Sequence, residues 1–225
     1  MIVSKTVSVV MCTYNGAKYL REQLDSIINQ TYPIYELIIQ DDCSMDETVN
    51  IIKEYMEKCS FIKLYINEHN LGFNLNFKSA AMKATGDYVA ISDQNDVWLP
   101  NKLEKQVKTI GACDICFSNH LLLKEGGRVE NNPFTDGCIE RLLFYNHVSG
   151  HTMLCRRDFI HNPSNWIDFF WYDWGLALNA SLQNGMVKVE EPLNLWRRHE
   201  SEVTMKEYEK NIHPKKSAYH AYLFG

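Results

Sequence analysis

The sequence predicts an α/β protein with a mostly parallel central sheet flanked by helices. Short apolar runs typical of buried strands alternate with segments of helical periodicity between residues 7 and 92. Polar residues follow the runs, and Gly, Pro and Asn separate the units as turns. This alternation is typical of parallel strands joined by right-handed crossovers.

The first unit is a strand over residues 7–12, ended by the turn 13–16 (Thr-Tyr-Asn-Gly). A helix follows it, because apolar residues recur at helical spacing, at Leu20, Leu24, Ile27 and Ile28. Pro33 then breaks the helical pattern and separates this unit from the next one.

The second unit begins with the apolar run 37–39, which ends in residues 40–42 (Gln-Asp-Asp). Ser44 and Glu47 follow in the Ser-x-x-Glu pattern of a capping box, in which two side chains satisfy backbone N–H groups at a helix start. We therefore expect a helix from this point through about Cys59.

The third strand is expected over 61–66, and the turn 67–72 separates it from a helix over about 74–84. That helix leads to the apolar strand 88–92, which ends in residues 93–96 (Asp-Gln-Asn-Asp). In open α/β sheets, ligands bind beyond the carboxyl ends of the strands.

The polar residues after three of these strands are therefore expected to meet at one edge of the sheet. They are Thr13, Tyr14, Asp41, Asp42, Asp93, Asn95 and Asp96. Close acids need a cation between them, and oxygen ligands suit a hard divalent ion. A solvated turn that caps the next helix is the alternative for residues 93–96 alone, and the convergence of three strand ends argues against it.

The composition fits a soluble, cytoplasmic enzyme with one sizeable core. The 225 residues are 45% hydrophobic and carry a net charge of -5 without a basic stripe, which argues against a nucleic-acid partner. The seven cysteines are interpreted as reduced core thiols, and Cys113 and Cys116 lack the second pair that a zinc site needs. Neither a signal peptide nor a bilayer-spanning stretch is recognisable, so membrane association is expected to be peripheral.

Several ordered segments resemble family 2 inverting glycosyltransferases, which have the GT-A fold. The nucleotide-sugar half is matched by VSVVMCTYNGAKYLREQLDSIINQTYP, ELIIQDDCSMDET, NLGFNLNFKSA and GDYVAISDQNDVWLPNKLE. The resemblance continues through GHTMLCRR, WYDWGLAL and PLNLWRRHESEV, and covers roughly residues 5 to 205. Within the family, the chain is most similar to bacterial enzymes of surface-polysaccharide assembly, including rhamnosyltransferases.

The resemblance implies that a sugar is moved, with inversion, from a nucleoside-diphosphate sugar to a glycan or lipid-linked acceptor. It implies Mn²⁺ or Mg²⁺ as the cofactor. It also implies a nucleotide-sugar-binding half (residues 1–110), an acceptor-binding and catalytic half of the same domain (111–205), and a C-terminal tail or truncated helix (206–225).

The residues implied to bind the nucleotide sugar are Thr13, Tyr14, Asn15, Asp42, Asp93 and Arg197. By the resemblance, Thr13 and Tyr14 form a ledge for the planar base, and Asp42 accepts a hydrogen bond from its imide N–H. Helix capping is the alternative for Asp42, but Ser44 already fills that role. Arg197 is assigned to donor or acceptor phosphates.

Residues 93–96 match the family's metal motif, Asp-x-Asp-Asp, except that Asn95 stands where the metal-ligating acid is expected. An amide oxygen can coordinate a divalent ion but carries no charge. Three alternatives stay open: Asp93 or Asp96 takes over as ligand, the protein binds metal weakly, or the chain is an inactive homologue. The resemblance also implies His199, in a Trp-Arg-Arg-His motif, as a metal or diphosphate ligand, with a solvated basic turn as the alternative.

Asp173 is implied as the catalytic base, because FWYDWGLAL matches the family position of that residue at a helix start. Inversion requires one carboxylate to remove the proton of the acceptor hydroxyl. Burial near Trp171 and Trp174 would raise its pKa, whereas the helix dipole would lower it. A helix N-cap is a compatible second role for Asp173, and Asp168 is the competing acid.

Two other functions are suggested by parts of the sequence. Asn95 favours a catalytically weak nucleotide-sugar-binding protein, and donor hydrolysis with added manganese would separate it from the enzyme. The acids at 41–42, after a parallel strand, suggest a receiver-type phosphoacceptor domain, which leaves Asp173 and His199 without a role. The glycosyltransferase is therefore the leading hypothesis.

Overall fold

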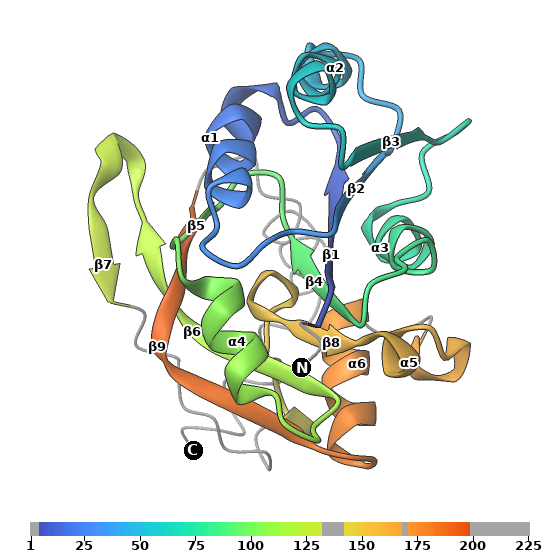
Figure 1. Cartoon of the computed structure of the whole chain (residues 1–225), viewed down its shortest axis with the longest axis vertical. Helices are drawn as coiled ribbons and strands as arrows, with labels where there is room; N and C mark the ends of the chain where they lie inside the picture. Colours follow the sequence, from blue (N-terminus) through green and yellow to red (C-terminus); the bar gives the residue numbers. More distant parts are fainter. Residues whose placement is uncertain (1–4, 132–141, 168–170, 199–225) are drawn as a thin grey trace, which may run out of the picture.

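The computed structural model describes residues 5–131, 142–167 and 171–198. Within these ranges, one sheet of nine strands runs through the molecule in the order β3-β2-β1-β4-β8-β6-β9-β5, with β7 beside β6 (Figure 1). Helices flank the sheet on both sides, which confirms the predicted α/β class.

The sheet is parallel in its first half and mixed in its second. Its strands are β1 (Val7–Thr13), β2 (Glu36–Asp41), β3 (Ile62–Ile66), β4 (Tyr88–Ser92), β5 (Val97–Trp98), β6 (Ile115–Leu123), β7 (Val129–Asn131), β8 (Leu154–Arg156) and β9 (Met186–Arg197). Strands β1 to β4 are parallel, as predicted, and so are β6 and β9. By contrast, β8 pairs antiparallel with both β4 and β6. The short strands β5 and β7 also pair antiparallel, β5 with β9 and β7 with β6.

The helices lie close to their predicted positions in the first half. They are α1 (Ala17–Ile28), α2 (Thr48–Lys58), α3 (Phe73–Ala81), α4 (Lys102–Thr109), α5 (Arg157–Ile160) and α6 (Tyr172–Ser181), with short 3-10 turns η1 (Glu125–Gly127), η3 (Gly150–Thr152) and η4 (Pro163–Asn165). The helix predicted through Ala84 ends at Ala81.

Each face of the sheet has its own core. On β1, Val7, Val9 and Met11 belong to the cluster that α1, α2 and α4 cover, whereas Val10 and Cys12 belong to the cluster that α3 and α6 cover. A strand buried on both faces must be apolar at nearly every position. That requirement explains the continuous apolar runs of β1, β2 and β4, which are buried throughout.

The six cysteines among the described residues are free thiols. Cys12, Cys116 and Cys155 are buried in β1, β6 and β8. Burial raises the pKa of all three thiols, to about 12 for Cys116. They behave as core side chains, in line with the interpretation of reduced thiols.

The capping box predicted at Ser44 and Glu47 is wrong. Helix α2 begins at Thr48, and its N-cap residue Glu47 makes no side-chain cap hydrogen bond. Asp46 Oδ1 accepts the Thr48 N–H at 3.0 Å. The Ser44 hydroxyl instead donates to Asp41 Oδ2 at 2.6 Å and accepts the Asn15 N–H at 2.9 Å. Asp41 is fully buried, and a buried carboxylate without donors costs more than a helix N–H that water can reach.

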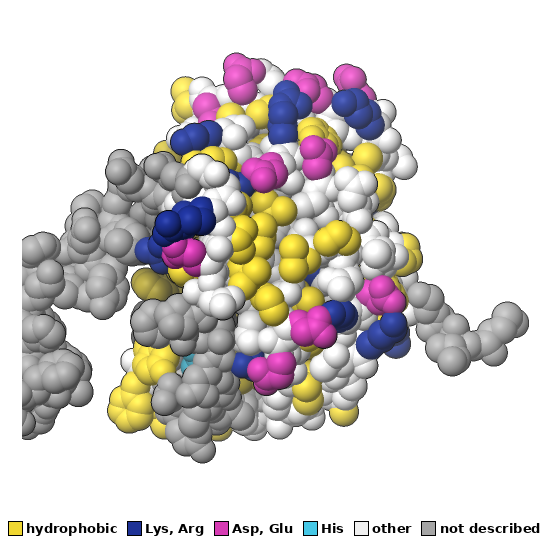
Figure 2. Space-filling model, turned by 90° about the vertical axis from the view of Figure 1, so that its left-hand side faces the viewer, with side chains coloured by type: hydrophobic (Ala, Val, Ile, Leu, Met, Phe, Trp, Pro, Cys, Tyr) yellow, Lys and Arg dark blue, Asp and Glu magenta, His cyan; other side chains and the backbone are white. Residues whose placement is uncertain are grey.

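Charged side chains of both signs intermix on the face shown in Figure 2, around a central band of hydrophobic side chains. Among the residues that the structure describes, no helix combines the length and the apolar character needed to cross a bilayer.

Candidate active site

Three strand ends lie side by side at the carboxyl edge of the parallel strands. In the strand register, Thr13 of β1 is opposite Asp41 of β2, and Met11 is opposite Ser92 of β4. The loops that follow these strands therefore meet, and they carry most of the predicted site residues. The convergence expected from the sequence is observed.

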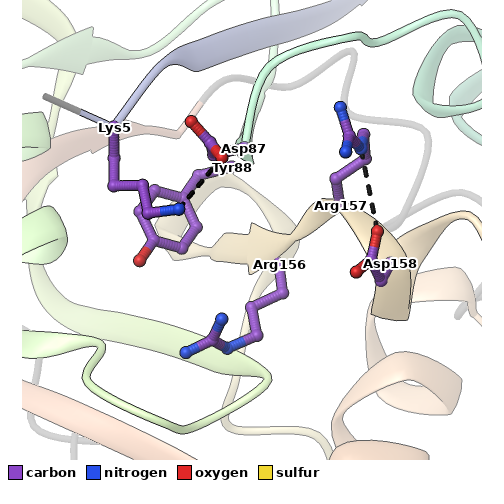
Figure 3. Close-up of a pocket in the computed structure, with 6 residues that line it drawn as sticks. All are labelled: Lys5, Asp87, Tyr88, Arg156, Arg157 and Asp158. Atoms are coloured by element: carbon purple, nitrogen blue, oxygen red, sulfur yellow. Dashed lines mark hydrogen bonds and ion pairs between the residues drawn. The ribbon is translucent and has the colours of Figure 1, made fainter. Parts of the chain in front are cut away.

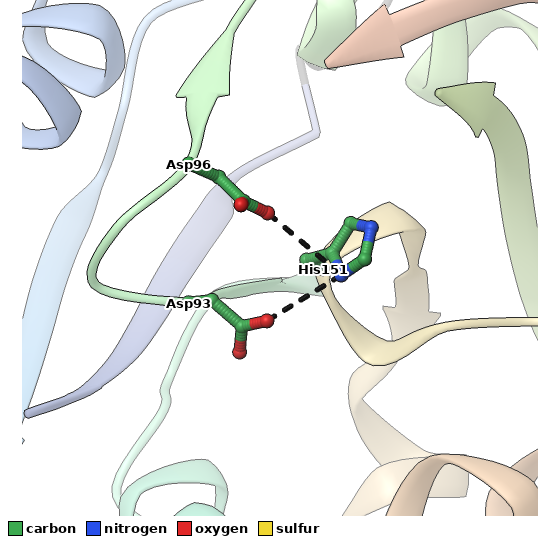
Figure 4. Close-up of side chains that lie close together, drawn as sticks. All are labelled: Asp93, Asp96 and His151. Carbon is green, nitrogen blue, oxygen red and sulfur yellow. Dashed lines mark ion pairs between the residues drawn. The ribbon is translucent and has the colours of Figure 1, made fainter. Parts of the chain in front are cut away.

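A cluster of two carboxylates and one imidazole lies at this edge (Figure 4). His151 Nδ1 is 3.4 Å from Asp93 Oδ2 and 3.8 Å from Asp96 Oδ2. The sequence analysis did not select His151. It comes from η3, just before β8, and the antiparallel pairing of β8 with β4 carries it to the loop after β4.

The cluster is buried on one side and open on the other. Asp96 and His151 are 0% and 4% exposed, whereas the Asp93 side chain is 36% exposed. Burial raises the pKa of Asp96, against the opposing effect of His151, and Asp93 raises it further. Burial alone would lower the pKa of His151, but the two carboxylates outweigh it and raise that pKa.

These three side chains fit a divalent ion. One ligand atom from each lies within 4.8 Å of the other two. Asp96 Oδ2 has no hydrogen-bond partner among the described residues, although buried polar atoms are rarely left unsatisfied. Carboxylates suit Mn²⁺ and Mg²⁺, and an imidazole favours a transition metal such as Mn²⁺.

Aromatic rings form the wall behind His151. Trp196 of β9 stacks on its ring with centroids 5.8 Å apart, and His120 of β6 meets it edge-on at 5.1 Å. Burial, aided by His151 and Lys102, lowers the pKa of His120 to about 3, so it is neutral. The wall is therefore uncharged at neutral pH and excludes water from one side of the cluster.

A buried lysine lies further behind the cluster. Lys102, at the start of α4, is 0% exposed, and its Nζ has no hydrogen-bond partner among the described residues. The ammonium lies 5.1 Å from the centre of the Trp98 ring. Burial lowers its pKa to about 7, although Cys116 and Asp96 oppose this change.

Asp173 lies in the first turn of α6, as predicted, next to η3. Its Oδ2 accepts the Gly150 N–H at 3.0 Å, and its Oδ1 accepts the Trp174 N–H at 2.8 Å. Burial raises the pKa of Asp173 to about 6, although these two hydrogen bonds lower it. Burial therefore outweighs the effects that favour the carboxylate form.

The loop after β1 contains one exposed ring and two residues that hold the loop. Tyr14 is 47% exposed. Thr13 is buried, and its hydroxyl donates to Asp41 Oδ2 at 2.7 Å. The Asn15 side chain accepts the Met45 N–H at 2.8 Å. Thr13 and Tyr14 were predicted to form the base ledge. The Tyr14 ring is exposed to solvent, whereas Thr13 is buried.

Asp42 lies beside this loop and holds the turn that precedes α3. Its carboxylate accepts hydrogen bonds from Asn67 Nδ2 at 2.6 Å, Leu71 N at 2.8 Å and Gly72 N at 2.9 Å. It is 3% exposed. A carboxylate offers about four acceptor positions, so one remains for a further donor.

Arg197 links the end of β9 to the acidic loop after β4. Its backbone N–H donates to Asp96 Oδ1 at 3.0 Å, and its Nε donates to the Asn95 carbonyl at 2.8 Å. Its guanidinium also pairs with Glu22 and lies 4.5 Å from the centre of the Tyr19 ring. The predicted residues Asn95, Asp96 and Arg197 are thus together, whereas His199 and the competing acid Asp168 lie outside the described residues.

A second pocket lies at the opposite edge of the sheet, where β4 begins and β8 ends (Figure 3). Its cations are already engaged. Lys5 pairs with Asp87 at 3.1 Å, and Arg157 Nε lies 3.7 Å from Asp158. Arg156 donates to backbone carbonyls. We interpret this pocket as structural.

The fold is an α/β fold of GT-A type, with a mixed sheet flanked by helices. Residues 8–165 match the model of Glycosyl transferase family 2, and the chain belongs to that family. It is 30% identical over 212 residues to a Bacillus subtilis protein provisionally named glycosyltransferase EpsE, covering 85% of this chain and 75% of that one. It is also 30% identical over 207 residues to an uncharacterized Mycobacterium tuberculosis protein, covering 86% of this chain and 59% of that one.

Solved structures share the fold. TarS of Staphylococcus aureus, in complex with UDP-GlcNAc, superposes with a TM-score of 0.72 at 20% identity, over 88% of this chain and 60% of that one. The mannosyltransferase PcManGT of Pyrobaculum calidifontis, in complex with GDP-Man and Mn²⁺, gives 0.73 at 17% identity, over 94% and 62%. This chain therefore spans about three fifths of several relatives that it matches.

Proposed function

We propose that this chain is a metal-dependent inverting glycosyltransferase that uses a nucleoside-diphosphate sugar. The observation that carries the proposal is the buried Asp93–Asp96–His151 cluster at the carboxyl edge of the sheet, between an exposed tyrosine and a carboxyl of raised pKa. Structural neighbours bind UDP-GlcNAc, or GDP-Man with Mn²⁺. They support a nucleotide-sugar donor and a divalent ion, with Mn²⁺ as our choice.

The donor would lie across the three loops. Tyr14 would stack on the base, and Asp42 would use its remaining acceptor position for the imide N–H. Asp93 is the most exposed member of the cluster and would contact the sugar nucleotide as well as the ion. Arg197 brings positive charge beside Asn95 and Asp96, where the diphosphate is expected.

The ion would be held by Asp93, Asp96 and His151, with Asn95 and His199 as further proposed ligands. A divalent ion at this position stabilises the negative charge that the leaving diphosphate gains. The two charged oxygens and the imidazole reduce the dependence of the site on Asn95. We therefore favour the first alternative for the altered motif, in which neighbouring acids serve as ligands.

Asp173 is the proposed base. As the acceptor oxygen forms its bond to the anomeric carbon, the bond from that carbon to the diphosphate breaks, and the hydroxyl proton passes to the Asp173 carboxylate. One direct displacement inverts the anomeric centre. We assign Asp173 to the acceptor side, and we assign the acceptor to the class of glycans or lipid-linked saccharides.

The chain's two proposed halves share this site. Residues 1–110 supply the donor loops, and residues 111–205 supply His151 and Asp173. A relative from Bacillus subtilis that is provisionally named for teichuronic acid biosynthesis supports a role in surface-polysaccharide assembly. Such a role would place the reaction in the cytoplasm, with peripheral membrane association where the acceptor is lipid-linked.

One observation favours a second candidate, a nucleotide-sugar-binding protein with weak or no transfer activity. Asn95 replaces the acid of the family's metal motif, which removes one negative charge from the loop. Under this alternative, donor and ion bind, but neither hydrolysis nor transfer follows.

The test combines binding and turnover. Thermal-shift measurements with a panel of nucleotide sugars, with and without Mn²⁺, should show a stabilising donor whose effect depends on the ion. His151→Gln should weaken Mn²⁺ binding at least about tenfold, as expected when a metal's coordination is disturbed. His161→Gln, at the end of α5, is the matched control. Equal Mn²⁺ affinity in the parent and His151→Gln would exclude this ion site, and a stabilised parent without turnover would favour the binding protein.

A further inference from the structure

Gln94 is the residue of the acidic loop that the proposed function does not use. It lies between Asp93 and Asn95, yet its side chain turns toward the loop after β1. Its Oε1 accepts the Tyr14 N–H at 2.9 Å, and its Nε2 donates to the Tyr14 carbonyl at 3.1 Å. One amide thus satisfies both polar groups of one residue, in the way that a neighbouring strand would.

Gly16 leaves the space for this contact. A Cβ at Gly16 would lie 2.1 Å from Gln94 Oε1 and 2.5 Å from Cδ, the carbon of the Gln94 side-chain amide. The Gly16 φ of -103° is open to any residue, so a Cβ here would displace the Gln94 amide without straining the backbone. The sequence Tyr-Asn-Gly therefore fits the Gln94 side chain.

The loop after β1 is held from two directions. On one side, the Asn15 N–H donates to Ser44 Oγ and the Asn15 side chain accepts the Met45 N–H, which joins it to the loop after β2. On the other side, Gln94 joins it to the loop that contains Asp93 and Asp96. The Tyr14 ring projects from the residue that Gln94 holds, and it is 47% exposed.

We propose that Gln94 is a positioning residue for the nucleotide base. By fixing the Tyr14 backbone, it sets the position of the ring on which the base stacks, and it joins the base pocket to the ion site. This inference rests on the proposed function, because it assumes that Tyr14 contacts a base. The ligand class is a nucleoside diphosphate. Loss of the Gln94 contacts should weaken only the part of the binding affinity that the base contributes.

The variant Gln94→Met keeps the approximate shape of the side chain and removes both hydrogen bonds. Calorimetry would compare UDP, dTDP and GDP with inorganic pyrophosphate, each in the presence of Mn²⁺. We expect the Kd of the best nucleoside diphosphate to rise about tenfold, the scale of two lost hydrogen bonds. The Kd of pyrophosphate, which lacks a base, should change by less than about twofold on the same scale.

Turnover supplies a second readout that a general loss of stability would not reproduce. The KM for the nucleotide-sugar donor should rise by the same factor as the Kd, with kcat retained. Gln183→Met is the matched control. Gln183 lies in the segment after α6, and the substitution removes a side-chain amide that donates to Asn165 at 2.8 Å. If Gln94→Met does not fold, Gln94→Asn, whose amide is one carbon too short to reach Tyr14, replaces it with the same expected pattern.

The outcomes separate the inference from the proposed function. An unchanged nucleoside-diphosphate Kd in the variant, or an equal loss for pyrophosphate, overturns the role of Gln94. A parent that binds pyrophosphate as tightly as every nucleoside diphosphate has no base pocket, and that result overturns the proposed function together with the inference.

Discussion

Asp173 shows how local contacts set the chemistry of one side chain. Two backbone N–H groups, from Gly150 and Trp174, stabilise its charged form, and the start of α6 does the same. Burial works against them and is the larger effect, so the pKa rises to about 6. The carboxyl is therefore ionised at neutral pH, yet it is a stronger base than an ordinary aspartate.

Asp173→Asn tests this assignment at the residue scale. The amide keeps the shape but cannot take a proton, so sugar transfer should fall by about 10²–10⁴-fold. Donor and Mn²⁺ affinity should hardly change, because we assign the residue to the acceptor side. In the parent, kcat/KM should rise with pH through about 6 as the carboxyl loses its proton, and then level off. Parental transfer rates in the variant would move the role to another acid, with Asp168 next in line.

Residues at the strand ends were predictable from the sequence, whereas their contacts were not. Asp93 and Asp96 directly follow an apolar run, and the change from apolar to polar residues marks the end of the strand in the sequence. His151 precedes β8, which has only three residues, and the pairing of β8 with β4 depends on the whole sheet. No local sequence pattern therefore indicates His151. Ser44 matched a local capping pattern, but its hydroxyl donates to the buried carboxylate of Asp41, three residues earlier at the end of β2. The capping pattern considers only the residues that follow the N-cap, so it does not include this competitor.

At the scale of elements, the junction of η3 and α6 joins the proposed ion site to the proposed base. η3 carries His151, and its first residue, Gly150, donates to Asp173. A Cβ at Gly150 would lie 2.0 Å from the Tyr172 hydroxyl oxygen and 2.7 Å from its ring carbon Cζ. Tyr172 is buried and stacks on Phe77 of α3 with ring centroids 4.6 Å apart. Side chains of α6 reach the backbone of η3 because the glycine has no side chain.

Gly150→Ala should separate these elements. Overpacking of this kind costs about 1–3 kcal/mol, which for a chain of this size corresponds to about 2–4 °C of Tm per kcal/mol. Transfer should fall further than stability explains, because the N–H that holds Asp173 moves. Adding Tyr172→Phe removes the nearest atom and should restore part of the loss in a double-mutant cycle, measured by thermal unfolding and transfer rate. Additive losses would contradict this contact.

The order of elements was predictable where each strand is buried on both faces. β1, β2 and β4 are continuous apolar runs, and the helices between them have one apolar stripe. The second half lacks this regularity. β9 (Met186–Arg197) is half-buried over most of its length, with exposed positions at Glu190 and Glu191 and buried ones at Leu193 and Asn194. It pairs with β6 along its length and with β5 near its end. Such long-range pairing leaves no local pattern.

At the scale of the whole molecule, Lys102 is a cost to stability. The free lysine pKa of about 10.4 falls to about 7 in the folded protein because of burial. The unfolded chain therefore binds more protons between these two values, and the free energy of unfolding rises with pH across that window. Below pH 7 both states are protonated, and the full cost of burying the charge is present.

Lys102→Met should therefore stabilise the protein at pH 6, by at least about 1 kcal/mol if it resembles other replacements of buried charges by apolar side chains. The gain should shrink as the pH rises from about 7 and level off above about 10.4, where the parent lysine is neutral in both states. Denaturant unfolding at pH 6 and pH 9 would measure it. Lys108→Met, on the exposed side of α4, is the control and should show no such gain. Destabilisation by Lys102→Met at both pH values would mean that the ammonium has partners that stabilise it.

The buried thiols can report when the strands of the sheet open to solvent. Cys12 lies in the parallel half, Cys116 in the mixed half, and Cys155 in β8, the strand that joins them. An alkylating reagent attacks only an accessible thiolate, so each of these cysteines should react only when its strand opens. Because one core cluster draws residues from both halves, we expect all three to be labelled in step as denaturant is added, with peptide mass spectrometry as the measurement. Earlier labelling of Cys12 would mean that the donor-binding half opens alone.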